Sequence, residues 1–342
     1  RLQGDWSSDV CSSDLSVRNR MVALSAGSTV LHLDTKKVRS IAIRIPNRPL
    51  TQQKIAKVLQ CIDLAIEKTE DLIAKYQHIK AGLMHDLFTR GVLPNGQLRP
   101  PREQAPELYR ETAIGWIPTD WETNGLATKN RPDTSWLRTG PFGSSLKGEH
   151  WRTEGNPVIT IGSLGIGDFI ADELLYVDDK DAARLKEFQL QEGDVVFSRV
   201  ADVGRSVVIR ALQATWIMSS NLMRIAVDAK KLRPDYLQLQ LAGDERVKRE
   251  MRKRVNSAGR DVANSDVLDQ LRFAWPTIQE QDRIIAAITR VSDALACELC
   301  KIEKLRKQKL GLMQDLLTGK VQVKVPTRSE ERRVGKECRS RW

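Results

Sequence analysis

Two stretches with a seven-residue spacing of apolar side chains constrain the fold of this chain more than any other feature of its sequence. The first stretch repeats at every seventh position through Ile55, Ile62, Thr69, Tyr76 and Leu83. A second series runs between these positions through Val58, Ala65, Leu72 and Ile79. This is the a/d spacing of a coiled coil, and Leu59, Ile66 and Ile73 widen the apolar stripe. The pattern predicts a helix over 51–90, about 60 Å long at 1.5 Å per residue.

The second stretch has the same character near the other end of the chain. Its apolar positions are Ile284, Ile288, Val291, Leu295, Ile302, Leu305, Leu312 and Leu316. Thr277 and Glu280 have the spacing of a capping box just after Pro276. Gly91 and Gly319 stand where the C-caps of the two helices are expected. Both predicted helices therefore have start and stop residues as well as periodicity.

The two helices belong to an internal repeat. LMHDLFT at 83–89 recurs as LMQDLLT at 312–318, and SAG at 25–27 recurs at 257–259. A period this long indicates a duplicated half-protein rather than a solenoid. We expect the two helices to pair as an antiparallel coiled coil; the alternative is a helical hairpin in an ordinary bundle. The residues predicted to pair the helices are Ile55, Ile62, Leu72, Ile79, Ile284, Val291, Leu305 and Leu312.

A mixed segment lies between the helices, after a connector at 94–106 that contains Pro, Gly and Arg. Residues 112–275 contain apolar, β-branched runs that predict strands at 157–161, 194–198, 206–209 and 221–227. The run 235–255 predicts a single helix with basic residues at its end. The fold class predicted is therefore α+β, with an antiparallel sheet in a globular domain flanked by the two long helices.

Charge points to the kind of partner. The chain of 342 residues has a formal net charge of +11 and a pI near 9.5, which favours a polyanion such as nucleic acid. No apolar run reaches the ~18 residues that a membrane-spanning helix needs, so no membrane partner is expected. The five cysteines are scattered, which fits a reducing cytoplasm rather than a disulfide framework.

Four short motifs, taken together and in their order along the chain, resemble those of a known protein family. The segments GWIPTDW at 115–121, GPFGSSLK at 140–147, GDVVFSR at 193–199 and VGR at 203–205 resemble a target recognition domain of the specificity (S) subunit of type I restriction-modification systems. Residues 65–87 resemble the central helical region of that family, and 277–323 its C-terminal helical region. The resemblance covers essentially all of 16–327.

The resemblance implies a function and a set of partners. A subunit of this family would read double-stranded DNA without being an enzyme itself, and would dock two modification (methyltransferase) subunits and the restriction (motor-nuclease) subunits. No cofactor is expected in this chain; S-adenosylmethionine, ATP and Mg would belong to the partner subunits. The resemblance further implies that the chain keeps only the last part of a first recognition domain and is truncated at its start.

Two other function classes stay open at this point. One is a stand-alone DNA methyltransferase or nuclease fragment, and the other is a coiled-coil adaptor with no role on DNA. Against the first, the chain has no Asn/Asp-Pro-Pro-aromatic motif and no recognisable nuclease carboxylates. The glycine-rich stretch 162–167 lacks the context of a dinucleotide site, and the lone pair Cys297 and Cys300 has no second pair for zinc. No catalytic or metal-binding residue is therefore predicted.

DNA contacts are predicted on the loops of the mixed domain. The residues chosen are Lys147, Arg199, Arg205, Asn221 and Arg260, with Arg138 and Arg152 as further candidates. Arginine can bind phosphates or guanine edges, and asparagine can read adenine. Arg199 and Arg205 flank one short turn and are expected to contact phosphates; alternatively, Arg205 pairs with Asp202 or Asp194 and only holds the hairpin.

The two ends of the chain are set apart. Residues 1–15 and 328–342 resemble translated sequencing-library adapters and are expected to be artefacts; the alternative is a pair of genuine disordered tails. The expected organisation between them is a remnant of the first recognition domain at 16–46, a central spacer helix at 47–91, a linker at 92–111, a second recognition domain at 112–276 and a C-terminal spacer helix at 277–323.

Overall fold

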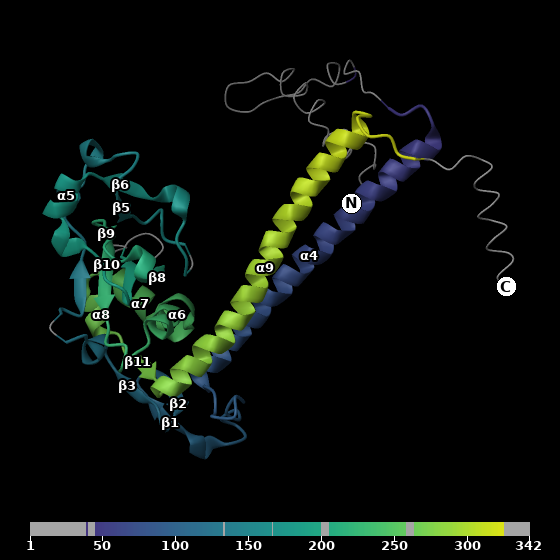
Figure 1. Cartoon of the computed structure of the whole chain (residues 1–342). Coiled ribbons are helices and arrows are strands. Elements are labelled where there is room, and N and C mark those ends of the chain that lie inside the picture. The colour runs from purple at the N-terminus through teal and green to yellow at the C-terminus, as the bar shows by residue number, and fades with distance from the viewer. Residues whose placement is uncertain are drawn as a thin grey trace. The chain divides into compact units, whose positions relative to one another are not determined.

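The computed structural model describes residue 39 and residues 45–132, 134–165, 167–199, 205–257 and 263–324. These residues divide into a helical unit, from the parts of the chain before Gln77 and after Asp293, and a mixed unit, Gln77–Asp293. Helices α4 (Pro49–Thr89) and α9 (Ile278–Leu317) each contribute to both units (Figure 1). The predicted adapter-like ends, and nearly all of the predicted remnant at 16–46, lie outside the described residues. No helix in the described part of the chain has the length and hydropathy to cross a membrane.

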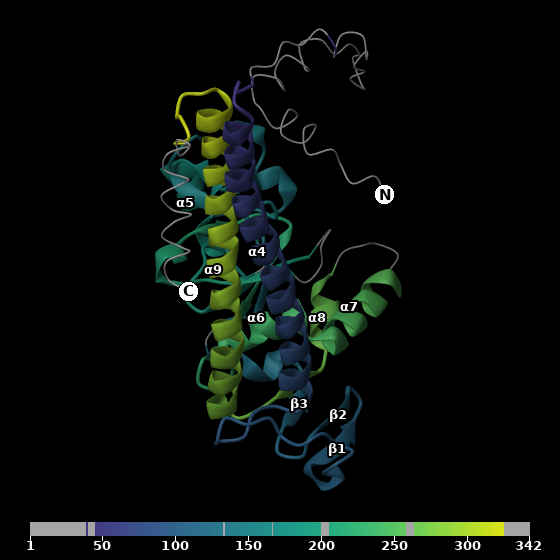
Figure 2. The same ribbon diagram turned by 90° about the vertical axis from the view of Figure 1, so that its right-hand side faces the viewer.

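The helical unit is an antiparallel pair. Ile55 and Leu59, from the start of α4, cluster with Met313 and Leu316, from the end of α9. Further along, Lys309 Nζ lies 2.7 Å from Asp63 and Arg306 Nη2 lies 3.0 Å from Glu70. Residue numbers therefore rise along α4 as they fall along α9, and Figures 1 and 2 show the two helices side by side. The predicted antiparallel coiled coil is confirmed.

The seam of α4 differs from the predicted one in one of its two series. Ile55 and Ile62 are buried as expected, but Val58 and Ile79 of the intervening series are 38% and 43% exposed. Leu59 is buried, and Ala65 and Leu72 of the predicted series are half-buried, as are their neighbours Ile66 and Ile73, so the predicted series leaves the interface only at its two ends. The structure thus does not place Ile79 in the helix interface. Positions three and four residues away both neighbour a given side chain, and this sequence is apolar at both, so periodicity alone did not distinguish them.

On α9, Ile302 is buried and Val291, Leu305 and Leu312 are half-buried, and Leu72 of α4 is half-buried too. Ile284 and Ile288 are also buried, but in the core of the mixed unit together with Leu87 and Phe88.

The main sheet of the mixed unit is antiparallel, as predicted, with the strand order β4-β10-β7-β8. Its strands are β4 (Leu137–Thr139), β7 (Asp194–Ser198), β8 (Ser206–Val208) and β10 (Leu222–Ala226). Every residue of β7, β8 and β10 is buried. Strands covered on both faces are continuously apolar rather than alternating, which is why the sequence predicted these three nearly to the residue.

Three smaller sheets surround the main one. The first has the strand order β6-β5-β9, with β5 (Asn156–Ile159), β6 (Leu175–Val177) and β9 (Ile217–Met218). The second pairs β1 (Tyr109–Thr112) with β2 (Gly115–Pro118). The third pairs β3 (Glu122–Asn124) with β11 (Phe273–Trp275). The β5–β9 pair is parallel. These strands are two to four residues long, too short for a periodicity to show, and only β5 was predicted.

The helices of the mixed unit correct one prediction. Besides α5 (Asp179–Arg184) and α8 (Ser265–Gln270), the unit has α6 (Pro234–Gly243) and α7 (Glu245–Ser257) in place of the single helix predicted at 235–255. The break falls at Asp244, whose backbone is extended. A Cβ atom on Gly243 would lie 1.8 Å from Cε of Met84 on α4, so the glycine lets α6 approach α4 closely just before the break.

The start of α9 is fastened to the linker by a buried carboxylate. Thr277 Oγ1 accepts the Glu280 backbone N–H at 3.3 Å, as in a capping box. The Glu280 carboxylate, however, accepts hydrogen bonds from Arg99, from Trp121 Nε1 at 3.1 Å and from the Val92 N–H at 2.8 Å. The predicted reciprocal half of the capping box is therefore replaced by long-range contacts. At the end of α4, Gly91 has a φ of +68°, the left-handed conformation expected of its C-cap.

Candidate nucleic-acid interface

One end of the main sheet gathers three of the residues predicted to bind DNA. Antiparallel pairing places the end of β7 beside the start of β8 and the start of β10, so Arg199, Arg205 and Asn221 come together. The backbone joins them: the Arg199 N–H donates to the Asn221 carbonyl at 3.2 Å, and the Ser198 N–H donates to the Arg205 carbonyl at 2.8 Å. We call this end the rim, comprising 140–142, 160–165, Arg199, Arg205 and 219–221.

Two further segments complete the rim. β5 and β9 run parallel and end here, and the Ser219 N–H donates to the Ile159 carbonyl at 2.9 Å. On the other side, the Gly140 N–H donates to the Leu222 carbonyl at 2.9 Å. A Cβ atom on Gly140 would lie 1.9 Å from the Ser219 carbonyl oxygen, so only glycine permits this approach of the two backbones.

Arg199 presents a guanidinium that has no partner among the described residues, on a fixed backbone. Its N–H and carbonyl are both used, the carbonyl accepting the Ala263 N–H at 2.7 Å. Its Nε is buried without a hydrogen-bond partner among the described residues, and no ion pair joins the side chain to any of them. A buried donor without a partner costs stability, so this arginine is the rim residue most in need of an external acceptor.

Arg205 is partly committed to the fold. Its Nη2 donates to the Leu164 carbonyl and so holds the glycine-containing turn after β5 against the main sheet. The alternative partner Asp194 lies at the other end of β7, where it pairs with Arg131 at 3.0 Å, and Asp202 lies outside the described residues. Arg205 therefore holds a turn and is not the partner of Asp194, while pairing with Asp202 stays untested.

Phe142 is the rim residue that the sequence analysis missed. It is 86% exposed, the highest value among the exposed large apolar side chains of the described chain, although it lies inside the quoted motif 140–147. Beside it, Asn221 is exposed too. Its position on the rim makes this exposed ring a candidate for stacking on a base.

The other predicted contacts are less concentrated. Lys147 is exposed and precedes the 3₁₀ turn Gly148–His150. Arg138 pairs with Glu187 at 3.2 Å and Arg152 with Asp178 at 2.9 Å, so both guanidinium groups already have carboxylate partners. Arg260 lies outside the described residues.

One histidine acquires a partner that local spacing did not indicate. His150 Nδ1 lies 2.9 Å from Asp181, 31 residues away, and Arg184 bonds the same carboxylate at 2.7 Å. The Arg184 guanidinium, together with His150, holds the pKa of Asp181 below its usual value. Arg184 also donates to the Ser145 carbonyl, so this cluster ties α5 to the segment that follows Phe142. It contains no nucleophile, and the described residues include no group of three potential metal ligands.

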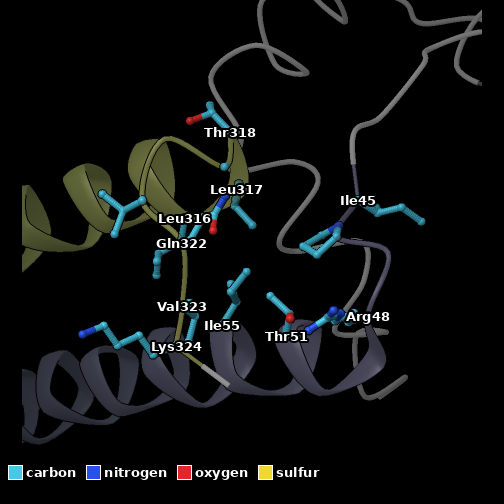
Figure 3. A pocket seen from close by; sticks show the side chains of 13 residues that line it. Ile45, Arg48, Thr51, Ile55, Leu316, Leu317, Thr318, Gln322, Val323 and Lys324 are labelled. Atoms are coloured by element: carbon cyan, nitrogen blue, oxygen red, sulfur yellow. The ribbon is translucent and has the colours of Figure 1, made fainter. Parts of the chain in front are cut away.

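A separate cavity of about 590 Å³ lies in the helical unit (Figure 3). Its walls come from the start of α4, including Arg48 and Ile55, and from the end of α9 with the residues after it, including Leu316 and Val323. Among the described residues, its lining includes no histidine, cysteine or carboxylate. By the internal repeat, Ile55 and Leu316 correspond to Ile284 and Leu87, which in the mixed unit are buried in the core of the folded domain.

Comparison with known proteins agrees with the class of protein that this geometry suggests, a DNA-recognition module. Residues 142–307 match the type I restriction modification DNA specificity domain. Among curated proteins, the chain is 24% identical over 303 residues to the type I restriction enzyme MjaVIII specificity subunit of Methanocaldococcus jannaschii, covering 87% of this chain and 66% of the relative. It is 24% identical over 283 residues to the putative MjaX specificity subunit of the same organism, covering 82% of this chain and 60% of the relative. The chain thus spans slightly less than two thirds of the length of these relatives.

Solved structures show the same fold. The S subunit of a type I restriction-modification system from M. genitalium has a TM-score of 0.54 at 13% identity, over 92% of this chain and 75% of that one. A chain from a study of complex assembly and conformational transition of the type I system has a TM-score of 0.53 at 15% identity, over 88% of this chain and 67% of that one. The resemblance found in the motifs is supported: residues 142–307 match the type I DNA specificity domain, and the chain as a whole is similar to type I restriction-modification specificity subunits.

Proposed function

We propose that this chain is a non-catalytic DNA-recognition subunit of a type I restriction-modification complex and that the rim reads one half of a bipartite duplex site. The observation that carries the proposal is the meeting of Arg199, Arg205, Asn221 and Phe142 at one end of the main sheet, inside the segment that matches the DNA specificity domain. Guanidinium groups suit phosphates and guanine, and the asparagine amide suits adenine.

The coiled coil supplies the second part of the proposal. α4 has 41 residues and α9 has 40, which makes each about 60 Å long at 1.5 Å per residue. Such a spacer separates two recognition domains by up to about two turns of DNA, at ~34–36 Å per turn. Reading two half-sites with one rigid protein raises affinity and requires both halves to be present.

The helical unit is proposed to carry the first recognition domain. The repeat equivalence of Ile55 with Ile284, and of Leu316 with Leu87, supports this assignment, because the latter two residues sit in the core of a folded domain. The cavity of Figure 3 is then the place where that domain packs.

The partners follow from the family. Two modification subunits, which use S-adenosylmethionine, and restriction subunits, which use ATP and Mg, are proposed to assemble with this chain in the cytoplasm. Neither alternative function has a supporting observation: the described residues include no group of three potential metal ligands for a nuclease, and an adaptor without a role on DNA leaves the rim unexplained.

Selection from a randomised duplex pool tests the proposal. Binding of the full chain should enrich one short motif, and Arg199→Ala should weaken binding to it. If no motif is enriched after several rounds of selection, the proposal is contradicted. Adding S-adenosylmethionine to the chain alone distinguishes a recognition subunit from a stand-alone methyltransferase, because the methyltransferase would bind the cofactor and methylate the duplexes.

A further inference from the structure

Helix α7 has one apolar face and one basic face. Val247, Met251 and Val255, spaced four residues apart, are buried in the core of the mixed unit. The 13-residue helix otherwise contains two glutamates and six basic residues, which are Arg246, Lys248, Arg249, Arg252, Lys253 and Arg254. Because the apolar residues face the core, the basic residues face the surface. Figure 2 shows α7 at the outside of its unit.

Half of these cations already have partners within the fold. Arg246 bonds Asp244 at 2.8 Å and the Phe88 carbonyl, Lys248 lies 3.2 Å from Glu245, and Arg254 lies 3.3 Å from Glu250. These three stabilise the helix and its attachment, and they account for both glutamates of the helix.

Of the other three cations, two have no partner among the described residues and one has only a long ion pair. Arg249 and Lys253 are exposed and have no ion pair or hydrogen bond with any residue that the structure describes. Arg252 reaches only Glu245, at 3.9 Å. Residues three and four apart lie on the same side of a helix, so the three form one basic face, and like charges at this spacing repel one another.

The basic face is connected to the rim. α7 ends at Ser257, and Ala263 donates its N–H to the Arg199 carbonyl at 2.7 Å. Six residue steps span at most about 20 Å, so the end of α7 lies within that distance of Ala263. A duplex carries one negative charge per ~1.7 Å of its axis, so DNA on the rim brings many phosphates within that range.

We propose that the basic face of α7, formed by Arg249, Arg252 and Lys253, binds the phosphate backbone of the duplex whose bases the rim contacts. The inference rests on the proposed function of the rim. The face contributes affinity without sequence preference, because phosphates are the same at every base pair. Charge complementarity and the short connection to Arg199 favour DNA over an acidic protein surface as its occupant.

A matched pair of double variants tests the basic face. Arg249→Gln combined with Lys253→Gln removes two uncompensated charges while keeping good helix formers. The control combines Lys230→Gln with Lys231→Gln, which removes two exposed lysines just beyond the end of β10 that is opposite the rim. Duplex binding by the full chain is followed by fluorescence anisotropy from about 50 to 200 mM salt, on the selected site and on a scrambled duplex.

The expected result is a loss of salt dependence. The slope of log K against log salt should fall by roughly 1.8 in magnitude, at about 0.9 per phosphate contact, for both duplexes alike. The ratio of the two affinities should stay at the wild-type value, and the lysine control should keep the wild-type slope.

Each other outcome overturns the inference in a distinguishable way. If the α7 variant keeps the wild-type slope while Arg199→Ala still loses affinity, the basic face does not bind DNA and an acidic protein becomes its expected partner. The proposed function of the rim is unaffected by that result. An equal loss of slope in the lysine control shows only an effect of net charge. A loss confined to the selected site means that the face reads bases. Failure of the wild-type chain to bind any duplex removes both proposals together.

Discussion

Arg99 and Glu280 form a buried, two-pronged ion pair across 181 residues of sequence, with both Nη atoms of the arginine bonded to the carboxylate. The same carboxylate accepts Trp121 Nε1 and the Val92 N–H, and Arg99 also bonds Asp120 at 2.7 Å. The linker, the start of the mixed domain and the first turn of α9 are thus fastened at one point within the mixed unit.

Removing one member of this pair should be costly. Arg99→Ala leaves the Glu280 carboxylate buried without its counter-charge, which typically destabilises a protein by about 3–5 kcal/mol. Urea unfolding of the wild type and the variant measures the difference. The exposed pair of Arg306 and Glu70 is the control, because Arg306→Ala should cost less than about 1 kcal/mol. Equal losses for the two variants would show that burial does not distinguish the pairs.

The two rim arginines should separate into a ligand-binding residue and a partly structural one. Arg205→Ala removes the hydrogen bond to the Leu164 carbonyl and should lower the free energy of unfolding by about 1 kcal/mol. Arg199→Ala removes no bond to the described fold and should leave stability within about 0.5 kcal/mol while reducing the salt slope of duplex binding by roughly 0.9. Thermal unfolding and anisotropy on the same preparations check both, and a stability loss in Arg199→Ala without a change in binding would contradict the assignment.

Phe142 should matter for DNA and not for folding. If its ring stacks on or wedges between bases, Phe142→Ala should weaken duplex binding by about 1–3 kcal/mol at unchanged thermal stability. Leu212→Ala is the control, because Leu212 is 81% exposed and follows the end of β8 that lies away from the rim. Identical affinities for the two variants would show that the exposed ring has no part in binding.

The α4 seam can be checked by neighbouring substitutions. Leu59→Ala empties a buried position next to Met313 and should cost about 2–5 kcal/mol. Val58→Ala, one residue earlier and 38% exposed, should cost well under half as much. Denaturant unfolding of both variants decides the register, and the reverse order of losses would restore the seam predicted from the sequence.

Local and periodic features were predictable from the sequence because each depends on neighbouring residues. The heptads marked both long helices, and Gly91 marked the end of the first. Buried, β-branched runs marked β7, β8 and β10. The alternation of antiparallel strands also brought Arg199, Arg205 and Asn221 to one end of the sheet, which the short turn between the first two had suggested.

Other features depended on contacts between distant residues. Glu280 has the sequence of a capping residue, but only the packed linker brings Arg99 and Trp121 to its carboxylate. The choice of Leu59 over Val58 reflects the position of α9, whose Met313 and Leu316 cluster with Leu59. Periodicity in this chain determined which segments are helices and strands, because that depends on spacing along the backbone. Tertiary packing determined which face is buried, which charges are neutralised and which stay free to meet a ligand, because burial and Coulomb interactions depend on distances in space.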